Sequence, residues 1–130
     1  MARVRESSVW DLVDSLVARR LDASLVALRD VVDGNDSALP ALGAIASCVR
    51  QLLKMDAAMR AGASPPEAAA AAGIPPFKAQ DRAQALRRLP PRVLGSWPRL
   101  LAAADVACKS SRRSGTAILE ETILAMCVET

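Results

Sequence analysis

Apolar residues recur every three or four positions along most of the chain, which is the spacing of one face of an α-helix. Near the N-terminus, Val9, Leu12, Val13, Leu16 and Val17 fall on one such face. No stretch shows the sustained alternation of apolar and polar residues that is typical of a strand. The periodicity predicts about seven helices, at roughly residues 8–20, 22–33, 37–61, 64–73, 76–89, 91–110 and 115–128.

Capping residues and helix breakers set these boundaries. Ser64 and Glu67 have the spacing of a capping box, and Gly73 is placed to end the same short helix. The longest helix ends at Gly62. Its expected buried stripe is Leu39, Leu42, Ala46, Val49, Leu53 and Ala57.

Pro98 lies inside the helical stretch 91–110, after Gly95, Ser96 and Trp97. A proline in a helix interior removes one hydrogen bond and clashes with the preceding turn. The sequence therefore predicts a kink at Pro98, or a break at which Ser96 caps a new helix.

The composition agrees with a helical fold. The chain has 130 residues, of which 52% are hydrophobic, and its only aromatic residues are Trp10, Phe77 and Trp97. The core must therefore consist of Leu, Val, Ile, Ala and Met, and Ala and Leu have the highest helix propensities. We expect one all-α domain over residues 1–130, a compact bundle of about six to seven helices.

Neither a membrane span nor a signal peptide is predicted. No window offers 18 consecutive apolar residues, and the basic N-terminus lacks an apolar signal core. These features favour the cytoplasm.

The sequence offers no constellation for catalysis. It contains no histidine and no tyrosine, and it lacks a phosphate-binding loop. Cys48, Cys108 and Cys127 are too widely spaced for a typical zinc site and suit buried positions. Asp11 and Asp14 fit a solvated helix face better than an acid/base pair. We expect no enzymatic activity, no metal and no cofactor.

The stretch 64–88, SPPEAAAAAGIPPFKAQDRAQALRR, leaves two interpretations open. A short helix, a glycine turn and a basic second helix are typical of a helix-turn-helix that reads DNA. Alternatively, two helices simply pack at an angle. The expected outward side chains are Lys78, Asp81, Arg82, Gln84 and Arg88, and the expected inward ones are Ile74, Phe77, Ala83 and Leu86. The packing interpretation predicts only weak, salt-sensitive DNA binding, which the net charge of +3 permits.

Three segments, in order, resemble one protein family. VWDLVDSLVARRLDASLVALRDVVDG is similar to the segment entering the C-terminal domain of bacterial DNA polymerase III delta subunits. AIASCVRQLLKMDAAMRAGASPPEAAAAAGIPPFKAQ resembles the long helix, alanine-rich helix and glycine turn of that domain. AADVACKSSRRSGTAILEETILAMC resembles its closing pair of helices.

The resemblance, over roughly residues 6–127, implies a collar domain of a clamp loader. In that family, collar domains pack into a ring that holds the loader subunits together. The implied partners are the ATPase subunit, gamma or tau, and delta-prime. The family's AAA+-like module and its clamp-opening contact lie in N-terminal domains that these 130 residues do not contain.

A collar needs a surface for its neighbours, and the last two helices are the expected place. Val106, Ile118, Thr122 and Met126 form the candidate apolar contact. Lys109, Arg112 and Arg113 form its charged rim, although this basic run also suits a solvated loop. Two alternatives remain: the apolar residues belong to the core, or the chain is a small helix-turn-helix DNA-binding regulator.

Overall fold

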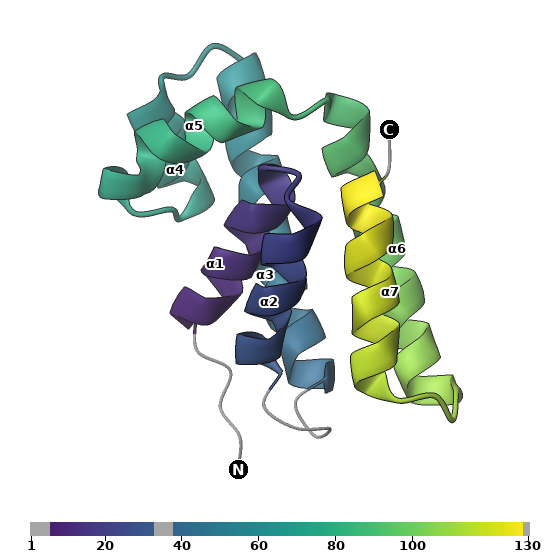
Figure 1. Ribbon diagram of the computed structural model, residues 1–130. Coiled ribbons are helices and arrows are strands. Elements are labelled where there is room, and N and C mark those ends of the chain that lie inside the picture. The colour runs from purple at the N-terminus through teal and green to yellow at the C-terminus, as the bar shows by residue number, and fades with distance from the viewer. Residues whose placement is uncertain (1–5, 33–37, 129–130) are drawn as a thin grey trace.

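The computed structural model describes residues 6–32 and 38–128, and within these residues it contains helices and no strand (Figure 1). The elements are α1 (Glu6–Val17), α2 (Leu21–Val31), α3 (Ala38–Arg60), α4 (Pro65–Ala72), the 3-10 helix η2 (Pro76–Lys78), α5 (Ala79–Arg88), α6 (Pro91–Ser110) and α7 (Gly115–Val128). The predicted all-α fold is confirmed.

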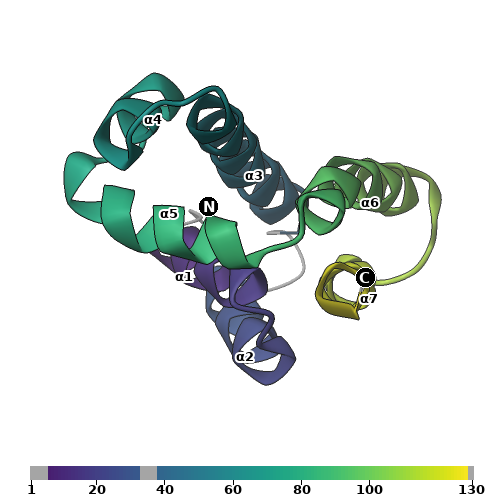
Figure 2. The ribbon, with the colours of Figure 1, turned by 90° about the horizontal axis from the view of Figure 1, so that it is seen from above.

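Helix α3 is the central element of the bundle. It packs against α1, α4, α6 and α7, and α1 and α2 pair beside it. Helices α6 and α7 form an antiparallel pair on one side, while α4 and α5 lie on the opposite side, as the view from above shows (Figure 2). Helix α6 therefore borders two different neighbours, α3 along one side and α7 along another.

The predicted helix ends around residues 64–73 are confirmed in detail. The Ser64 side chain accepts a hydrogen bond from the Glu67 backbone at 3.4 Å, and Glu67 Oε1 accepts one from the Ser64 backbone at 3.0 Å. These hydrogen bonds lower the pKa of the Glu67 carboxyl. Gly73 ends the helix with a φ of 77°, a conformation that favours glycine.

The predicted helix 76–89 is divided into η2 and α5, and two of its side chains point the other way from expectation. Phe77, expected inward, is 80% exposed, because it lies on η2 where the chain turns between Pro76 and α5. Arg82, expected outward, is only 5% exposed. Ile74, Ala83 and Leu86 are buried as expected.

Pro98 does not break α6, which runs without interruption from Pro91 to Ser110. Ser96 does not cap a new helix, because its hydroxyl donates to the Val93 carbonyl at 2.7 Å. The adjacent Trp97 is fully buried and anchors this part of the helix in the core. The packing of Trp97 therefore offsets the hydrogen bond that Pro98 cannot donate.

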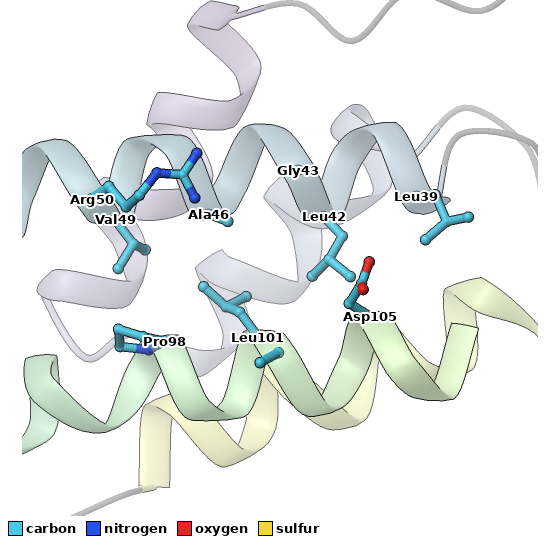
Figure 3. Close-up of a pocket in the computed structure, with 10 residues that line it drawn as sticks. Leu39, Leu42, Gly43, Ala46, Val49, Arg50, Pro98, Leu101 and Asp105 are labelled. Atoms are coloured by element: carbon cyan, nitrogen blue, oxygen red, sulfur yellow. The ribbon is translucent and has the colours of Figure 1, made fainter. Parts of the chain in front are cut away.

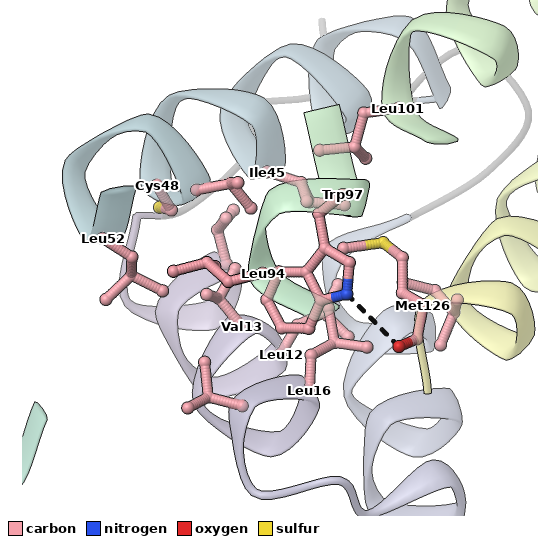
Figure 4. Close-up of a cluster of buried hydrophobic side chains, with 14 of the residues drawn as sticks. Leu12, Val13, Leu16, Ile45, Cys48, Leu52, Leu94, Trp97, Leu101 and Met126 are labelled. Atoms are coloured by element: carbon pink, nitrogen blue, oxygen red, sulfur yellow. Dashed lines mark hydrogen bonds between the residues drawn. The ribbon is translucent and has the colours of Figure 1, made fainter. Parts of the chain in front are cut away.

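The part of the core drawn in Figure 4 lies between α1, α3, α6 and α7, and buried residues of α2, α4 and α5 extend it. In α3 the buried stripe is Ala38, Ala41, Leu42, Ile45, Cys48, Val49, Leu52 and Met55, so only Leu42 and Val49 of the predicted stripe are right. Leu39, Ala46, Leu53 and Ala57 are exposed or only partly buried. Both sets of residues have helical spacing, and it is Ile45, Leu52 and Met55 that occupy the interior.

Candidate partner surface on helices α6 and α7

The structure separates the seven candidate contact residues into two groups. Val106 is 62% exposed, and Lys109, Arg112 and Arg113 are also exposed. In contrast, Ile118 is 3%, Thr122 9% and Met126 0% exposed. The expectation that these three α7 side chains form an accessible surface therefore needs correction.

The correction has a simple physical cause. The buried face of α7 consists of Ile118, Leu119, Thr122, Ile123, Met126 and Cys127. This face holds α7 against α6, α2 and α3. Thr122 can be buried because its hydroxyl donates to the Ile118 carbonyl at 2.8 Å, so it leaves no unpaired donor. The solvent side of α7 instead carries Leu124, which is 46% exposed, and Val128.

A shallow cavity of about 200 Å³ between α6 and α7 brings some of the candidates together. Arg113, Ile118 and Thr122 line it, with Leu100 and Ala103 from α6. Met126 is not among its lining residues and packs beside Trp97 instead (Figure 4). We use the name outer face for this cavity, lined at its rim by Arg113 and Glu121, together with the exposed apolar residues of the two helices, Val106, Leu124 and Val128, which do not line the cavity.

Two exposed ion pairs lie on α6, α7 and the loop between them, and one of them lies at the rim of the cavity. Lys109 Nζ lies 2.9 Å from Asp105 Oδ2, one turn back on α6. Arg113 pairs with Glu121 of α7, and its backbone N–H donates to the Ser111 hydroxyl at 3.0 Å. Exposed pairs of this kind contribute little to folding, at most about 1 kcal/mol. The Arg113–Glu121 pair places both charges beside a small apolar hollow, which suits contact with a protein surface.

A second depression, a groove between α3 and α6, was not predicted from the sequence (Figure 3). It has a volume of about 340 Å³. Its lining is Leu39, Leu42, Gly43, Ala46, Val49, Arg50, Pro98, Leu101, Ala102 and Asp105. The available sequence signal was Gly43, a glycine in the interior of the longest helix, where it lowers helix propensity.

A third cavity, of about 420 Å³, lies in the region that resembles a helix-turn-helix. Trp10, Phe77 and Arg82 contribute to its lining. The Arg82 guanidinium stacks over Trp10, and its Nε lies 3.4 Å from Asp14 Oδ1. Burial raises the pKa of the Asp14 carboxyl, and Arg82 opposes that shift. Arg82 therefore binds within the fold and is not presented to a DNA groove.

The thiols of Cys48 and Cys127 lie in surroundings that favour packing over reactivity. Burial raises the pKa of the Cys48 thiol to about 11, with the Glu6 carboxylate adding to the shift, and burial also raises the pKa of Cys127. Neither thiol is in the low-pKa setting of a reactive cysteine. Within residues 6–32 and 38–128, no three His, Cys, Asp or Glu side chains form a metal-binding group. In the same part of the chain, no helix is long and apolar enough to cross a bilayer.

Comparisons with known proteins agree on one type of domain. The family model for the C-terminal domain of the DNA polymerase III delta subunit matches residues 6–126. Among solved structures, the Bacillus subtilis DNA clamp loader delta protein (YqeN) is similar, with a TM-score of 0.77 and 20% sequence identity. The similarity covers 98% of this chain and 38% of the Bacillus chain. No curated protein matches this chain in sequence.

Proposed function

The chain belongs to the family of C-terminal domains of DNA polymerase III delta subunits, and we propose that it acts as a scaffold domain of a clamp loader. Its role is to help assemble the complex that loads the sliding clamp for DNA replication. The single observation that carries the proposal is the extent of the family match, which spans residues 6–126 and includes every described helix except the last residues of α7.

The proposed partners are the clamp-loader ATPase subunit, gamma or tau, and delta-prime. Exposed apolar side chains on both helices, Val106 and Leu124, and the ion pair of Arg113 and Glu121 at the cavity support a protein contact on the outer face. The similarity covers 38% of the Bacillus delta protein. We propose that other parts of the loader carry out the ATP-dependent steps and the opening of the clamp. We place this work in the cytoplasm, where bacterial DNA is replicated.

The DNA-binding alternative has no comparable support. In the stretch 64–88, Arg82 is buried against Trp10 and Asp14, so the second helix loses one of its candidate base-contacting side chains. Any contact of this chain with DNA is expected to be weak, independent of sequence and strongly reduced by salt, as phosphate contacts are.

The test is a binding experiment between the chain and the purified ATPase subunit or delta-prime of the same organism. We expect association at micromolar concentrations. Val106→Glu should weaken it about tenfold or more, since a charge would be placed in an apolar contact. Val26→Glu on α2 is the matched control, because Val26 and Val106 are both exposed helical valines with the same exposed fraction of 62%.

The two variants separate the possible outcomes. Equal melting temperatures and weakened binding by Val106→Glu alone would support the outer face as a contact surface. If Val26→Glu weakens binding to the same extent, the outer face has no special role. If the unmodified chain associates with neither subunit, the scaffold proposal is wrong.

A further inference from the structure

The groove between α3 and α6 is open to solvent although most of its wall is apolar. Leu42, Val49 and Leu101 form its buried floor, and Leu39 at one end is 42% exposed. Figure 3 shows α3 and α6 as its two walls, with Arg50 near one end and Asp105 near the other. It lies between α3 and α6, whereas the cavity of the outer face lies between α6 and α7, and the two share no lining residue.

The presence of glycine at position 43 is not required by the packing or the backbone conformation of the domain. Gly43 lies in the interior of α3, where glycine costs about 1 kcal/mol relative to alanine. Its φ is not positive, and a Cβ added there would meet no atom of the described residues within 4 Å. Gly115 is a contrast, because a Cβ added there would lie 2.5 Å from the Ala38 Cβ.

The missing side chain at Gly43 has a direct consequence for the shape of the groove. Ala46 lies one turn further along α3, and Ala102 lies on the opposite wall. The side chains at a contact set how closely two helix axes approach. A helix placed over Gly43, Ala46 and Ala102 could therefore approach the backbone of α3 and α6 closely.

The charges at the two ends of the groove favour a helical partner of defined direction. Arg50 is exposed, and no carboxylate of the described residues forms an ion pair with it. Asp105, at the other end, is bound to Lys109 and keeps 44% of its side chain exposed. A helix has a positive N-terminus and a negative C-terminus. Its dipole would match the groove with the N-terminus near Asp105 and the C-terminus near Arg50.

We propose that the groove between α3 and α6 binds an amphipathic helix of a neighbouring clamp-loader subunit. The apolar stripe of that helix packs on Gly43, Ala46 and Leu101, and an acidic side chain near its C-terminus pairs with Arg50. This inference rests on the proposed scaffold function. It gives the domain a second contact surface beside the outer face, as head-to-tail packing in a ring requires two different surfaces on each subunit.

Substitution of Gly43 provides a sharp test, because it fills the groove without disturbing the core. Gly43→Leu should keep the fold and raise or maintain the melting temperature, since leucine has the higher helix propensity and the site is open. It should weaken binding of the chain to the purified ATPase subunit or to purified delta-prime about tenfold or more. Gly95→Leu on α6 is the matched control, because a Cβ there also meets no described atom within 4 Å and Gly95 does not line the groove.

Charge reversal tests the proposed direction of the docked helix. Arg50→Glu should weaken the same interaction about tenfold or more, and the loss should shrink as salt is raised. Arg87→Glu is the control, because Arg87 is exposed on α5 and does not line the groove. Equal binding by the Arg50 and Arg87 variants would show that Arg50 forms no ion pair with the partner, and would overturn the assigned direction of the helix.

The remaining outcomes separate the groove from the scaffold function. If the unmodified chain binds and the two leucine variants bind equally well, the groove inference is wrong and the scaffold function stands. If the unmodified chain binds neither subunit, both are wrong. Sedimentation of the chain alone tests whether a second copy of the chain occupies the groove. Self-association that Gly43→Leu abolishes would assign the groove to that second copy and overturn the inference.

Discussion

The guanidinium carbon of Arg82 lies 3.7 Å from the centroid of the Trp10 ring, which joins α5 to α1 across the bundle. Arg82 is 5% exposed, and its Nε also contacts Asp14 Oδ1 at 3.4 Å. Arginine can occupy such a site because its flat, weakly hydrated guanidinium stacks on aromatic rings while it remains charged. One of the five side chains expected to face outward in the helix-turn-helix-like stretch is therefore a structural link between two helices.

Removal of that link should destabilise the domain. We expect Arg82→Ala to lower the free energy of unfolding by about 1–3 kcal/mol, because it removes the stack on Trp10 and leaves a gap between α1 and α5. Arg82→Lys should retain the charge but lose the planar stack, and its loss should be smaller. Urea denaturation of the two variants and the unmodified chain measures the difference. A variant Arg82→Ala that is as stable as the unmodified chain would contradict this role.

Gly115 should be intolerant of a side chain, in contrast to Gly95. A Cβ at Gly115 would lie 2.5 Å from the Ala38 Cβ, so Gly115→Ala forces the start of α7 away from α3. We expect a loss of about 1–3 kcal/mol, typical of overpacking. Gly95→Ala should instead stabilise α6 by about 0.5–1 kcal/mol, because the site is open and helical. Melting curves that rank the two variants in the opposite order would contradict the packing described for α3 and α7.

Local chemistry explains which parts of the fold the sequence could predict. The helix 65–72 was predictable because Ser64, Glu67 and Gly73 act within a few residues of one another. The buried stripe of α3 was not, because two apolar stripes of similar spacing compete in an alanine-rich helix. Burial there depends on contacts with α1 and α6, which are distant in the sequence. The exposure of Phe77 and the burial of Arg82, both opposite to the prediction, have the same cause. Only the fold brings Trp10 next to Arg82.

The sequence also could not predict which residues of the candidate partner surface are accessible. Ile118 and Met126 have the spacing of an apolar helix face, which is the same for a core and for an interface. The structure assigns both residues to the core and leaves Val106 exposed. The groove between α3 and α6 was not predictable either, because Gly43 indicates an open site only once the neighbouring helix is known to leave its Cβ position empty.

The buried thiol of Cys48 makes stability depend on alkaline pH. Its pKa is raised from an ordinary value of about 9 to about 11, so the folded state holds the proton more tightly than the unfolded state. Below pH 9 both states are protonated and the thiol has no effect. Between pH 9 and 11 only the unfolded state loses the proton, so stability should fall by up to about 1.4 kcal/mol per pH unit.

Cys48→Ala isolates this contribution from other groups that titrate at high pH. The variant should be less stable at pH 7, because a buried side chain is shortened, but its stability should fall less steeply between pH 9 and 11. Chemical denaturation at pH 7, 9, 10 and 11 gives both slopes. Parallel slopes for the variant and the unmodified chain would show that the Cys48 pKa is not raised.

Trp97 should control how firmly the end of α7 is held in the bundle. Its side chain is fully buried, and its Nε1 donates a hydrogen bond to the Met126 carbonyl at 3.2 Å (Figure 4). Arg19 Nη1 lies 3.5 Å from the same carbonyl oxygen, so α6 and the segment after α1 both bind the C-terminal part of α7. Trp97→Phe removes the indole donor and part of the buried volume while it keeps an aromatic ring.

We expect Trp97→Phe to lower the free energy of unfolding by about 2–4 kcal/mol, from the cavity and the lost hydrogen bond together. Met126→Leu is the control, because it changes the side chain but keeps the carbonyl, and it should cost less than about 1.5 kcal/mol. Hydrogen exchange gives the decisive measurement, since loss of the indole donor should speed exchange in α7 more than in α4. If both variants destabilise the chain equally and exchange rises uniformly, the bond between Trp97 and Met126 does not hold α7 in place.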